Sequence, residues 1–238
     1  MRPALIVAHG QPSAPAPQQA AIEGLAAAVA ALSGRRVLGA TLAMPGALDQ
    51  AVAAAPDAMV YPMFMAAGWF TGTELPRRLA AAGAPGMDIL PPFGLDPTLP
   101  ELCLLKISQA AIACGWDPHQ VTLLLIAHGS QRARGSAQGA EAMAELLRMR
   151  LGRVVTGFIE EAPFLVDAAR DPGPRALALP FFATEAEHVT DDIPTGLAQA
   201  GFAGPCLPPI GLASEVPGLI AAALRRADAA IASRRAEA

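Results

Sequence analysis

Short runs of aliphatic residues alternate along this chain with longer segments whose polar residues recur at helical spacing. In the first half the pattern predicts strands at residues 4–8, 37–42, 59–64 and 87–90. Helices are predicted between and after these strands, at residues 18–32, 47–55, 74–82 and 97–114. Strands that alternate with helices in this way are typical of parallel βα units, in which the sheet is buried on both faces.

The second half of the chain repeats this order. Strands are predicted at residues 121–127, 153–159 and 176–182, and helices at residues 137–150, 163–170, 193–200 and 217–233. Loops are predicted at corresponding places in the two halves, at residues 66–73 and 183–192. The pattern therefore describes one arrangement of elements that occurs twice.

The amino-acid sequence also repeats. Residues 5–11 read LIVAHGQ and residues 124–130 read LLIAHGS, while LPPFGL at 90–95 matches LPPIGL at 207–212. The separation stays nearly constant and is about half the chain, which indicates two copies of a whole lobe rather than a solenoid of short repeats.

We therefore expect an α/β fold with two pseudo-symmetric lobes, each a doubly wound parallel sheet flanked by helices. The segment GWDPH marks the boundary, so the N-terminal lobe spans residues 1–118 and the C-terminal lobe spans residues 119–238. The lobes are expected to face each other across a cleft. Because duplication supplies both halves of this cleft in one chain, we expect a monomer.

Composition excludes several classes of protein. With 53% hydrophobic residues and a mean hydropathy of +0.38, the chain of 238 residues can bury a core. A net charge of −4 and a single lysine leave no basic surface for nucleic acid. The apolar stretches are shorter than the roughly 20 residues that span a membrane, and no signal peptide is evident. We expect a cytoplasmic protein whose cysteines (Cys103, Cys114 and Cys206) are ordinary thiols.

Both copies of the AHG motif place a histidine where a buried strand ends. His9 follows the first predicted strand, and His128 follows the strand at 121–127. Ligands of open parallel sheets bind outside the carboxyl ends of the strands, so both histidines occupy positions suited to chemistry.

The two copies differ at the neighbouring strand ends. In the sequence alignment His188 corresponds to Phe70, and the pair Glu160 and Glu161 corresponds to Leu42 and Ala43. Only the second copy thus combines two histidines with acidic residues. Imidazole and carboxylate together suit first-row divalent ions, so we expect a metal site in the C-terminal lobe and a degenerate site in the N-terminal lobe.

These residues resemble a known family. The AHGS turn, the segment FIE at 158–160, the segment PFF at 180–182 and His188 before the segment DIP are similar to the class II tetrapyrrole chelatases of the CbiX and SirB type. Members of that family insert cobalt or ferrous iron into sirohydrochlorin in cobalamin or sirohaem biosynthesis. The resemblance implies that His128 and His188 bind the metal and that Glu160 is the acidic residue, with Glu161 as the alternative.

The reaction accounts for an incomplete metal site. A metal that is passed to four pyrrole nitrogens needs open coordination positions, and a carboxylate or a neutral histidine can accept the pyrrole protons. Co²⁺ or Fe²⁺ is then a substrate, and no organic cofactor is needed. The tetrapyrrole carries many carboxylates, which makes Arg132 and Arg134 candidate substrate-binding residues, together with Ser130 and His9. A carrier of metal or tetrapyrrole without turnover remains the alternative.

Overall fold

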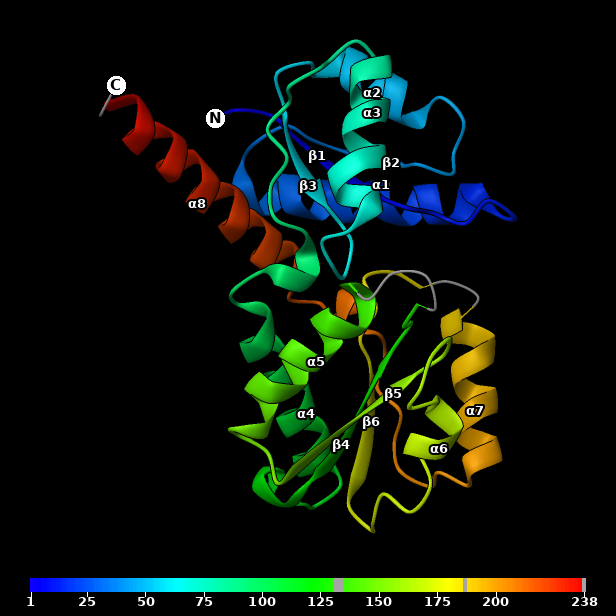
Figure 1. Cartoon of the computed structure of the whole chain (residues 1–238). Helices are drawn as coiled ribbons and strands as arrows, with labels where there is room; N and C mark the ends of the chain where they lie inside the picture. Colours follow the sequence, from blue (N-terminus) through cyan, green and yellow to red (C-terminus); the bar gives the residue numbers. More distant parts are fainter. Residues whose placement is uncertain (131–134, 186–187, 237–238) are drawn as a thin grey trace. The chain divides into compact units, whose positions relative to one another are not determined.

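The computed structural model describes the backbone of residues 1–130, 135–185 and 188–236, and their side chains except those of residues 135, 136, 188 and 234–236. The chain divides into two compact units (Figure 1). Unit 1 contains Met1–Asp96 and Ser214–Ala238, and unit 2 contains Pro97–Ala213.

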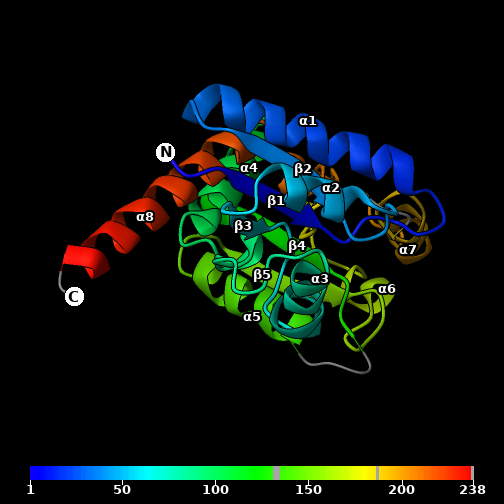
Figure 2. The same ribbon diagram turned by 90° about the horizontal axis from the view of Figure 1, so that it is seen from above.

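Unit 1 is built on a parallel sheet of three strands, β1 (Ala4–Ala8), β2 (Val37–Thr41) and β3 (Met59–Pro62). β1 lies in the centre, and all its residues are buried, as expected for a strand covered on both sides. Two helices, α1 (Pro15–Ser33) and α8 (Val216–Ala236), pack together and contact β2 and β3, respectively. Figure 2 shows α1 running along the β1 and β2 strands.

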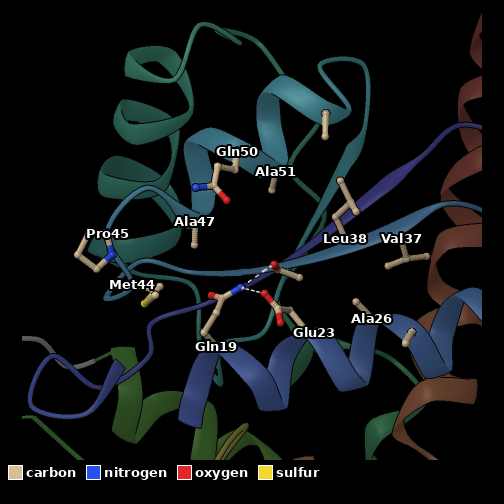
Figure 3. A pocket seen from close by; sticks show the side chains of 13 residues that line it. Gln19, Glu23, Ala26, Val37, Leu38, Met44, Pro45, Ala47, Gln50 and Ala51 are labelled. Carbon is tan, nitrogen blue, oxygen red and sulfur yellow. Dashed lines mark hydrogen bonds between the residues drawn. The ribbon is translucent and has the colours of Figure 1, made fainter. Parts of the chain in front are cut away.

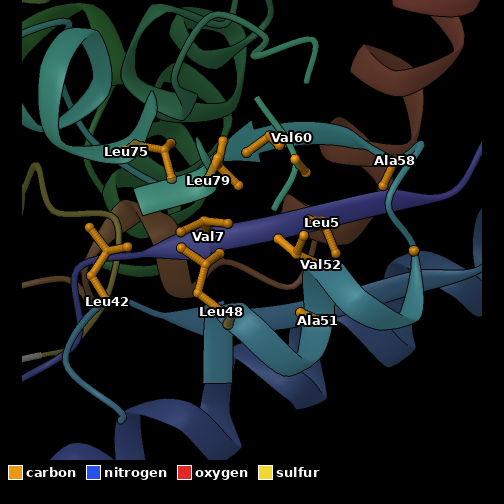
Figure 4. Packing of buried hydrophobic residues seen from close by; sticks show 13 residues of the cluster. Leu5, Val7, Leu42, Leu48, Ala51, Val52, Ala58, Val60, Leu75 and Leu79 are labelled. Carbon is orange, nitrogen blue, oxygen red and sulfur yellow. The ribbon is translucent and has the colours of Figure 1, made fainter. Parts of the chain in front are cut away.

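The opposite face of this sheet is covered by α2 (Ala47–Ala54) and α3 (Leu75–Ala81). Alternate residues of β1 supply the apolar contacts, since successive side chains of a strand point to opposite faces. Figure 4 shows Leu5 and Val7 of β1 packed among leucines and a valine of the two helices, namely Leu48, Val52, Leu75 and Leu79.

Unit 2 repeats the arrangement with β4 (Thr122–Ala127), β5 (Arg153–Phe158) and β6 (Ala176–Pro180). Here β4 is the central strand, and β5 and β6 flank it in parallel. The helices α4 (Leu99–Ala113) and α5 (Gly135–Arg148) pack on one face, and α6 (Leu165–Ala168) and α7 (Ile193–Ala200) pack on the other. The expected α/β fold, with two parallel sheets flanked by helices, is confirmed.

The two sequence copies exchange their last helices. Although α4 follows the first copy in sequence, it packs on β6 and α5 of unit 2. Although α8 follows the second copy, it packs on α1 and β3 of unit 1. The repeat boundary expected at residue 118 therefore does not coincide with the division between the units, which falls at Asp96 and Ala213.

Ion pairs hold α8 in unit 1. Asp228 pairs with Arg35, whose side chain is fully buried. Arg226 donates a hydrogen bond from Nη2 to Oδ2 of Asp96 at 2.7 Å. In the described parts of the chain, no helix combines the length and the apolar character required to cross a membrane.

Two predicted elements are reduced to a fraction of their expected length. The predicted strand at residues 87–90 is reduced to one bridge between Ile89 and Val60, so each sheet has three strands. The predicted helix at residues 163–170 is confined to α6, because the chain just before it is extended. There Pro163 accepts a hydrogen bond from the N–H of Phe158 at 2.9 Å, and Phe164 forms a bridge to the end of β5.

The loops predicted at residues 66–73 and 183–192 are wrong in their second halves. π-Helical turns occur there, η1 at Phe70–Glu74 and η4 at His188–Asp192, and they run directly into α3 and α7. Such turns are rare and are frequent at functional sites. Phe70 and His188 thus occupy the same place in the two units, the first position of the π turn.

The repeated LPPFGL and LPPIGL segments have a packing explanation. Gly94 donates its N–H to the carbonyl of Phe64, and Gly211 donates to Phe182, both at 2.9 Å. A Cβ at Gly94 would lie 1.8 Å from the oxygen of Met65, and one at Gly211 would lie 2.0 Å from that of Ala183. Only glycine permits this close approach of two backbone segments.

Candidate metal site

His128 directly follows β4, so it stands at the carboxyl end of the central strand of unit 2. The N–H of Glu160, just beyond the end of β5, donates to the carbonyl of His128 at 3.0 Å. Gly129 then turns the chain with a φ of +73°, a conformation that favours glycine. A Cβ there would also lie 2.9 Å from Cγ of Glu161. The AHGS turn is therefore fixed against the end of β5.

The imidazole of His128 is oriented by its own turn. Nδ1 lies 2.9 Å from the carbonyl oxygen of Gly129. A carbonyl only accepts hydrogen bonds, so Nδ1 carries the proton of the neutral ring and Nε2 retains the lone pair that a metal requires. Metal-binding histidines commonly donate their other ring N–H to such a carbonyl.

A carboxylate lies beside this ring. Oε2 of Glu160 is 3.7 Å from Nδ1 of His128, and the two side chains are 45% and 36% exposed, respectively. Both groups are thus accessible to a ligand at the strand ends.

Glu161 has a different role in the turn. Its Oε1 accepts a hydrogen bond from the backbone N–H of Ser130 at 2.7 Å. This bond joins the end of β5 to the residue that follows Gly129. The two adjacent glutamates are therefore not equivalent, because Glu161 closes the turn and Glu160 lies next to the imidazole.

Three other predicted site residues lie outside what the structure describes. Arg132 and Arg134 fall outside the described residues, and the side chain of His188 is outside the described side chains. Among the side chains that are described, no group of three His, Cys, Asp or Glu residues could hold a metal ion. The structure therefore brings together His128 and Glu160 of the expected set, with His188 at the start of η4.

Unit 1 contains a counterpart of this turn. His9 follows β1, its Nδ1 lies 2.7 Å from the carbonyl oxygen of Gly10, and Gly10 has a φ of +75°. The neighbouring ring is that of Phe70, whose centroid lies 4.6 Å from that of His9 at an interplanar angle of 86°. The first position of the π turn thus places a side chain against the strand-end histidine.

The strand register corrects the sequence alignment of the acidic residues. Ala8 pairs with Thr41 in unit 1, whereas Ala127 pairs with Phe158 in unit 2. Glu160 therefore corresponds to Ala43 and Glu161 to Met44, one residue later than expected. The backbone agrees, because the N–H of Ala43 donates to the carbonyl of His9 at 2.9 Å, as Glu160 does to His128. With the corrected register, the first copy still has no acidic residue at either position.

A charged cluster in unit 1 was not predicted from the sequence. Glu74, at the end of η1, accepts hydrogen bonds from Nε of Arg77 at 2.8 Å and Nε of Arg78 at 2.7 Å. Both bonds stabilise the charged carboxylate, the bond from Arg77 more strongly, and lower the pKa of Glu74 to about 2. Nη1 of Arg78 also donates to the carbonyl oxygen of Leu42 at 2.7 Å. A comparison of the two sequence copies could have revealed this cluster. The second copy has Asp192, Thr195 and Gly196 at the three positions, so it lacks both arginines.

A separate pocket of about 410 Å³ lies between α1, β2 and α2 (Figure 3). Gln19 spans its floor, where the side chain donates to the carbonyl of Gly39 at 3.0 Å and to Glu23 at 2.7 Å, and accepts from the N–H of Thr41 at 2.8 Å. The amide thereby satisfies backbone groups on the outer edge of β2. None of the candidate site residues lines this pocket.

Comparison with known proteins identifies the family. The family model described as CbiX matches residues 122–227, which include the His128 turn and η4. A solved structure of CbiX, the terminal enzyme for the biosynthesis of siroheme in denitrifying bacteria, is 58% identical in sequence. The match covers 95% of this chain and 99% of that chain, with a TM-score of 0.89. The chain belongs to the CbiX family.

More distant structures share the fold of this CbiX family member. DR2241 from Deinococcus radiodurans, a multi-domain protein with structural similarity to chelatases, is 24% identical, with a TM-score of 0.66 over 93% of this chain and 54% of that chain. SirB from Bacillus subtilis, solved with Fe³⁺, is 16% identical, with a TM-score of 0.69 over 94% of this chain and 95% of that chain. A search of curated proteins found no match.

Proposed function

We propose that this protein inserts a divalent metal, Co²⁺ or Fe²⁺, into sirohydrochlorin or a related tetrapyrrole. The observation that carries the proposal is the His128 turn, where the Nδ1 contact with Gly129 orients Nε2 as the metal-binding atom and the carboxylate of Glu160 lies beside the same ring. Membership of the CbiX family supports it, because a relative of 58% identity is the terminal enzyme of siroheme biosynthesis in denitrifying bacteria.

In this proposal His128, His188 and Glu160 are the metal-binding and catalytic residues. The support for His188 is its place in the fold, since Phe70 at the same position of η1 packs its ring against His9. We assign Glu161 to the positioning of the turn rather than to the metal, because its carboxylate already accepts the N–H of Ser130.

Three ligands on one side of the metal suit a transfer reaction. Two imidazoles and one carboxylate leave coordination positions open, where the pyrrole nitrogens of the incoming substrate bind. Insertion of one M²⁺ into the metal-free macrocycle displaces two pyrrole N–H protons, so charge is balanced without any electron transfer. Glu160 accepts one of these protons and the neutral imidazole of His128 accepts the other once the metal has left them, and both protons then pass to solvent. The reaction needs no organic cofactor.

The carboxylates of the substrate require hydrogen-bond donors on the protein. Arg132 and Arg134 follow the His128 turn directly in sequence, and guanidinium groups bind carboxylates through two parallel hydrogen bonds. We propose them as substrate-binding residues, with Ser130 and His9 as further contacts.

An absorbance assay tests the proposal. Sirohydrochlorin is mixed with Co²⁺ or Fe²⁺ under anaerobic conditions, with the protein present at about one hundredth of the substrate concentration. Conversion of the whole substrate pool to the metallated chromophore, faster than without protein, is expected. Conversion limited to one equivalent per protein would instead identify a carrier, and an unchanged rate would contradict the proposal.

We also propose that the protein acts as a cytoplasmic monomer. The three cysteines are free, which suits a reducing compartment. Both copies of the lobe are present in one chain, so a second chain is not needed to supply the other copy. Light scattering over a range of concentrations is expected to give the mass of one chain of 24.3 kDa. An activity that requires a dimer would contradict this assignment.

A further inference from the structure

Aromatic side chains gather at the carboxyl end of β1 in unit 1. The ring of Phe70 lies 5.0 Å from that of Trp69 in an edge-to-face arrangement and 6.0 Å from that of Phe64 in a stacked one. Its other neighbour is the imidazole of His9, at 4.6 Å. We refer to Trp69, Phe70, Phe64 and His9 as the aromatic cluster.

Three members of the aromatic cluster remain open to solvent. His9 is exposed, Trp69 is 59% exposed and Phe70 is 37% exposed. Aromatic residues make up only 5% of this chain, which has two tryptophans. A high overall aromatic content therefore does not explain why three of them gather at one strand end. An apolar surface that stays exposed, instead of joining the core, is typical of a binding surface.

The rings are also held in place before any ligand binds. Each of the three contacts has a centroid separation within the range of favourable aromatic pairs, about 4.5–7 Å. Trp69 and Phe70 have two side-chain torsions each, so little conformational entropy is lost when a ligand binds to them. The aromatic cluster is therefore a preorganised platform, in which Phe70 supports the exposed ring of Trp69 and that ring suits a flat conjugated molecule.

The two sequence copies differ sharply at this place. Glu187 and His188 of the second copy correspond to Trp69 and Phe70 of the first. The first copy thus has two aromatic residues where the second copy has an acidic residue and a histidine.

Positive charge lies at the same edge of the sheet. Two guanidinium groups, Arg77 and Arg78, share the single carboxylate of Glu74, which leaves one excess positive charge. Arg78 also contacts the carbonyl of Leu42, and the N–H of the next residue, Ala43, bonds to His9. The side chain of Arg77 is 64% exposed. A ligand on the platform that carries carboxylates would be attracted by this charge.

We propose that Trp69 binds the face of the tetrapyrrole macrocycle by stacking, that Phe70 supports its indole ring edge-to-face, and that Arg77 attracts one of the peripheral carboxylates. The first lobe, which lacks the acids and the second histidine of the metal site, then has a substrate-binding role of its own. The identity of this ligand rests on the proposed function, whereas the existence of the platform does not.

The test is the affinity of the metal-free substrate, measured separately from turnover. Sirohydrochlorin is titrated into wild type, Trp69→Ala and Trp69→Phe without added metal. Loss of one stacked ring is expected to weaken binding roughly tenfold in Trp69→Ala, while Trp69→Phe keeps most of the affinity. Trp116→Ala, which removes the other tryptophan, is the matched control and is expected to bind as wild type does. Circular dichroism confirms that each variant is folded.

A second pair of measurements separates this inference from the proposed function. For insertion, Trp69→Ala is expected to raise KM about tenfold with little change in kcat, and to leave Co²⁺ binding unchanged. Unchanged substrate affinity and KM in Trp69→Ala, with an active wild type, would overturn the platform alone. Substrate binding that depends on Trp69 in a wild type that does not insert metal would overturn the proposed function and leave the platform.

Discussion

The carboxylate of Glu161 accepts a hydrogen bond from the backbone N–H of Ser130, with 2.7 Å between Oε1 and N. This bond ties the end of β5 to the turn that follows His128. Glu160, the adjacent residue, instead places Oε2 at 3.7 Å from Nδ1 of that histidine. One of two consecutive acids thus closes the turn, and the other lies beside the imidazole of His128.

Substitution of the two acids is expected to separate stability from activity. Glu161→Ala removes a charge-assisted hydrogen bond and should lower the free energy of unfolding by about 2 kcal/mol. Glu160→Gln removes a partly exposed carboxylate and should leave stability nearly unchanged, yet reduce the insertion rate at least about tenfold. Urea unfolding and the absorbance assay measure the two effects. A stable, inactive Glu161→Ala beside a fully active Glu160→Gln would reverse the assignment.

The turn itself is expected to depend on glycine. Gly129→Ala forces a Cβ into a conformation with a φ of +73° and to 2.9 Å from Glu161 Cγ, which should cost at least about 1 kcal/mol. Gly10→Ala is the matched variant, with a φ of +75° and a Cβ at 2.8 Å from Cβ of Thr41.

Both glycine variants should lower the unfolding midpoint by similar amounts, but only Gly129→Ala should lose most of its Co²⁺ binding. Equal losses of Co²⁺ binding in the two variants would show that the effect comes from general destabilisation rather than from the site.

The Glu74 cluster predicts a defined dependence of stability on pH. Because its pKa falls from 4.5 to about 2 in the folded protein, the charged carboxylate stabilises the folded state above pH 4.5. Glu74→Gln should therefore be less stable than wild type at neutral pH, and the difference should shrink as the pH falls from 4.5 towards 2. Urea unfolding at several pH values measures this difference. A difference that persists unchanged at pH 2 would show that the ion pairs are not its source.

Glu101→Gln is a suitable control for the pH series. Glu101 pairs with Arg150 at 3.6 Å, and the side chains of Glu101 and Arg150 are 70% and 59% exposed, respectively. Exposed pairs of this kind contribute little to stability, so this variant should follow wild type at every pH.

The strands and most helices could be predicted because their signal is local. All five residues of β1 are apolar and buried, and AHG follows both central strands, so periodicity and repetition were sufficient. The exchange of α4 and α8 between the units could not be predicted, because an apolar helix face does not specify which of two similar sheets it covers.

The sequence names the candidate site residues but not the contacts that they make. Sequence spacing alone leaves Glu160 and Glu161 interchangeable, and only the backbone geometry of the turn distinguishes them. For the same reason, the sequence alignment places the acids opposite Leu42 and Ala43, one residue too early. An alignment of letters does not record that Ala8 pairs with Thr41. The exposure of Trp69 and Phe70 could not be predicted, because aromatic residues after a strand are more often core residues.

The most direct test of the working site uses its internal duplicate. His128 and His9 occupy equivalent turns, and each has its Nδ1 next to the carbonyl of the following glycine. The rate of Co²⁺ insertion into sirohydrochlorin is measured for His128→Ala and His9→Ala under identical conditions. We expect His128→Ala to lose insertion almost completely and His9→Ala to keep a substantial rate. An inactive His9→Ala beside an active His128→Ala would place the metal site in the first copy and contradict the account.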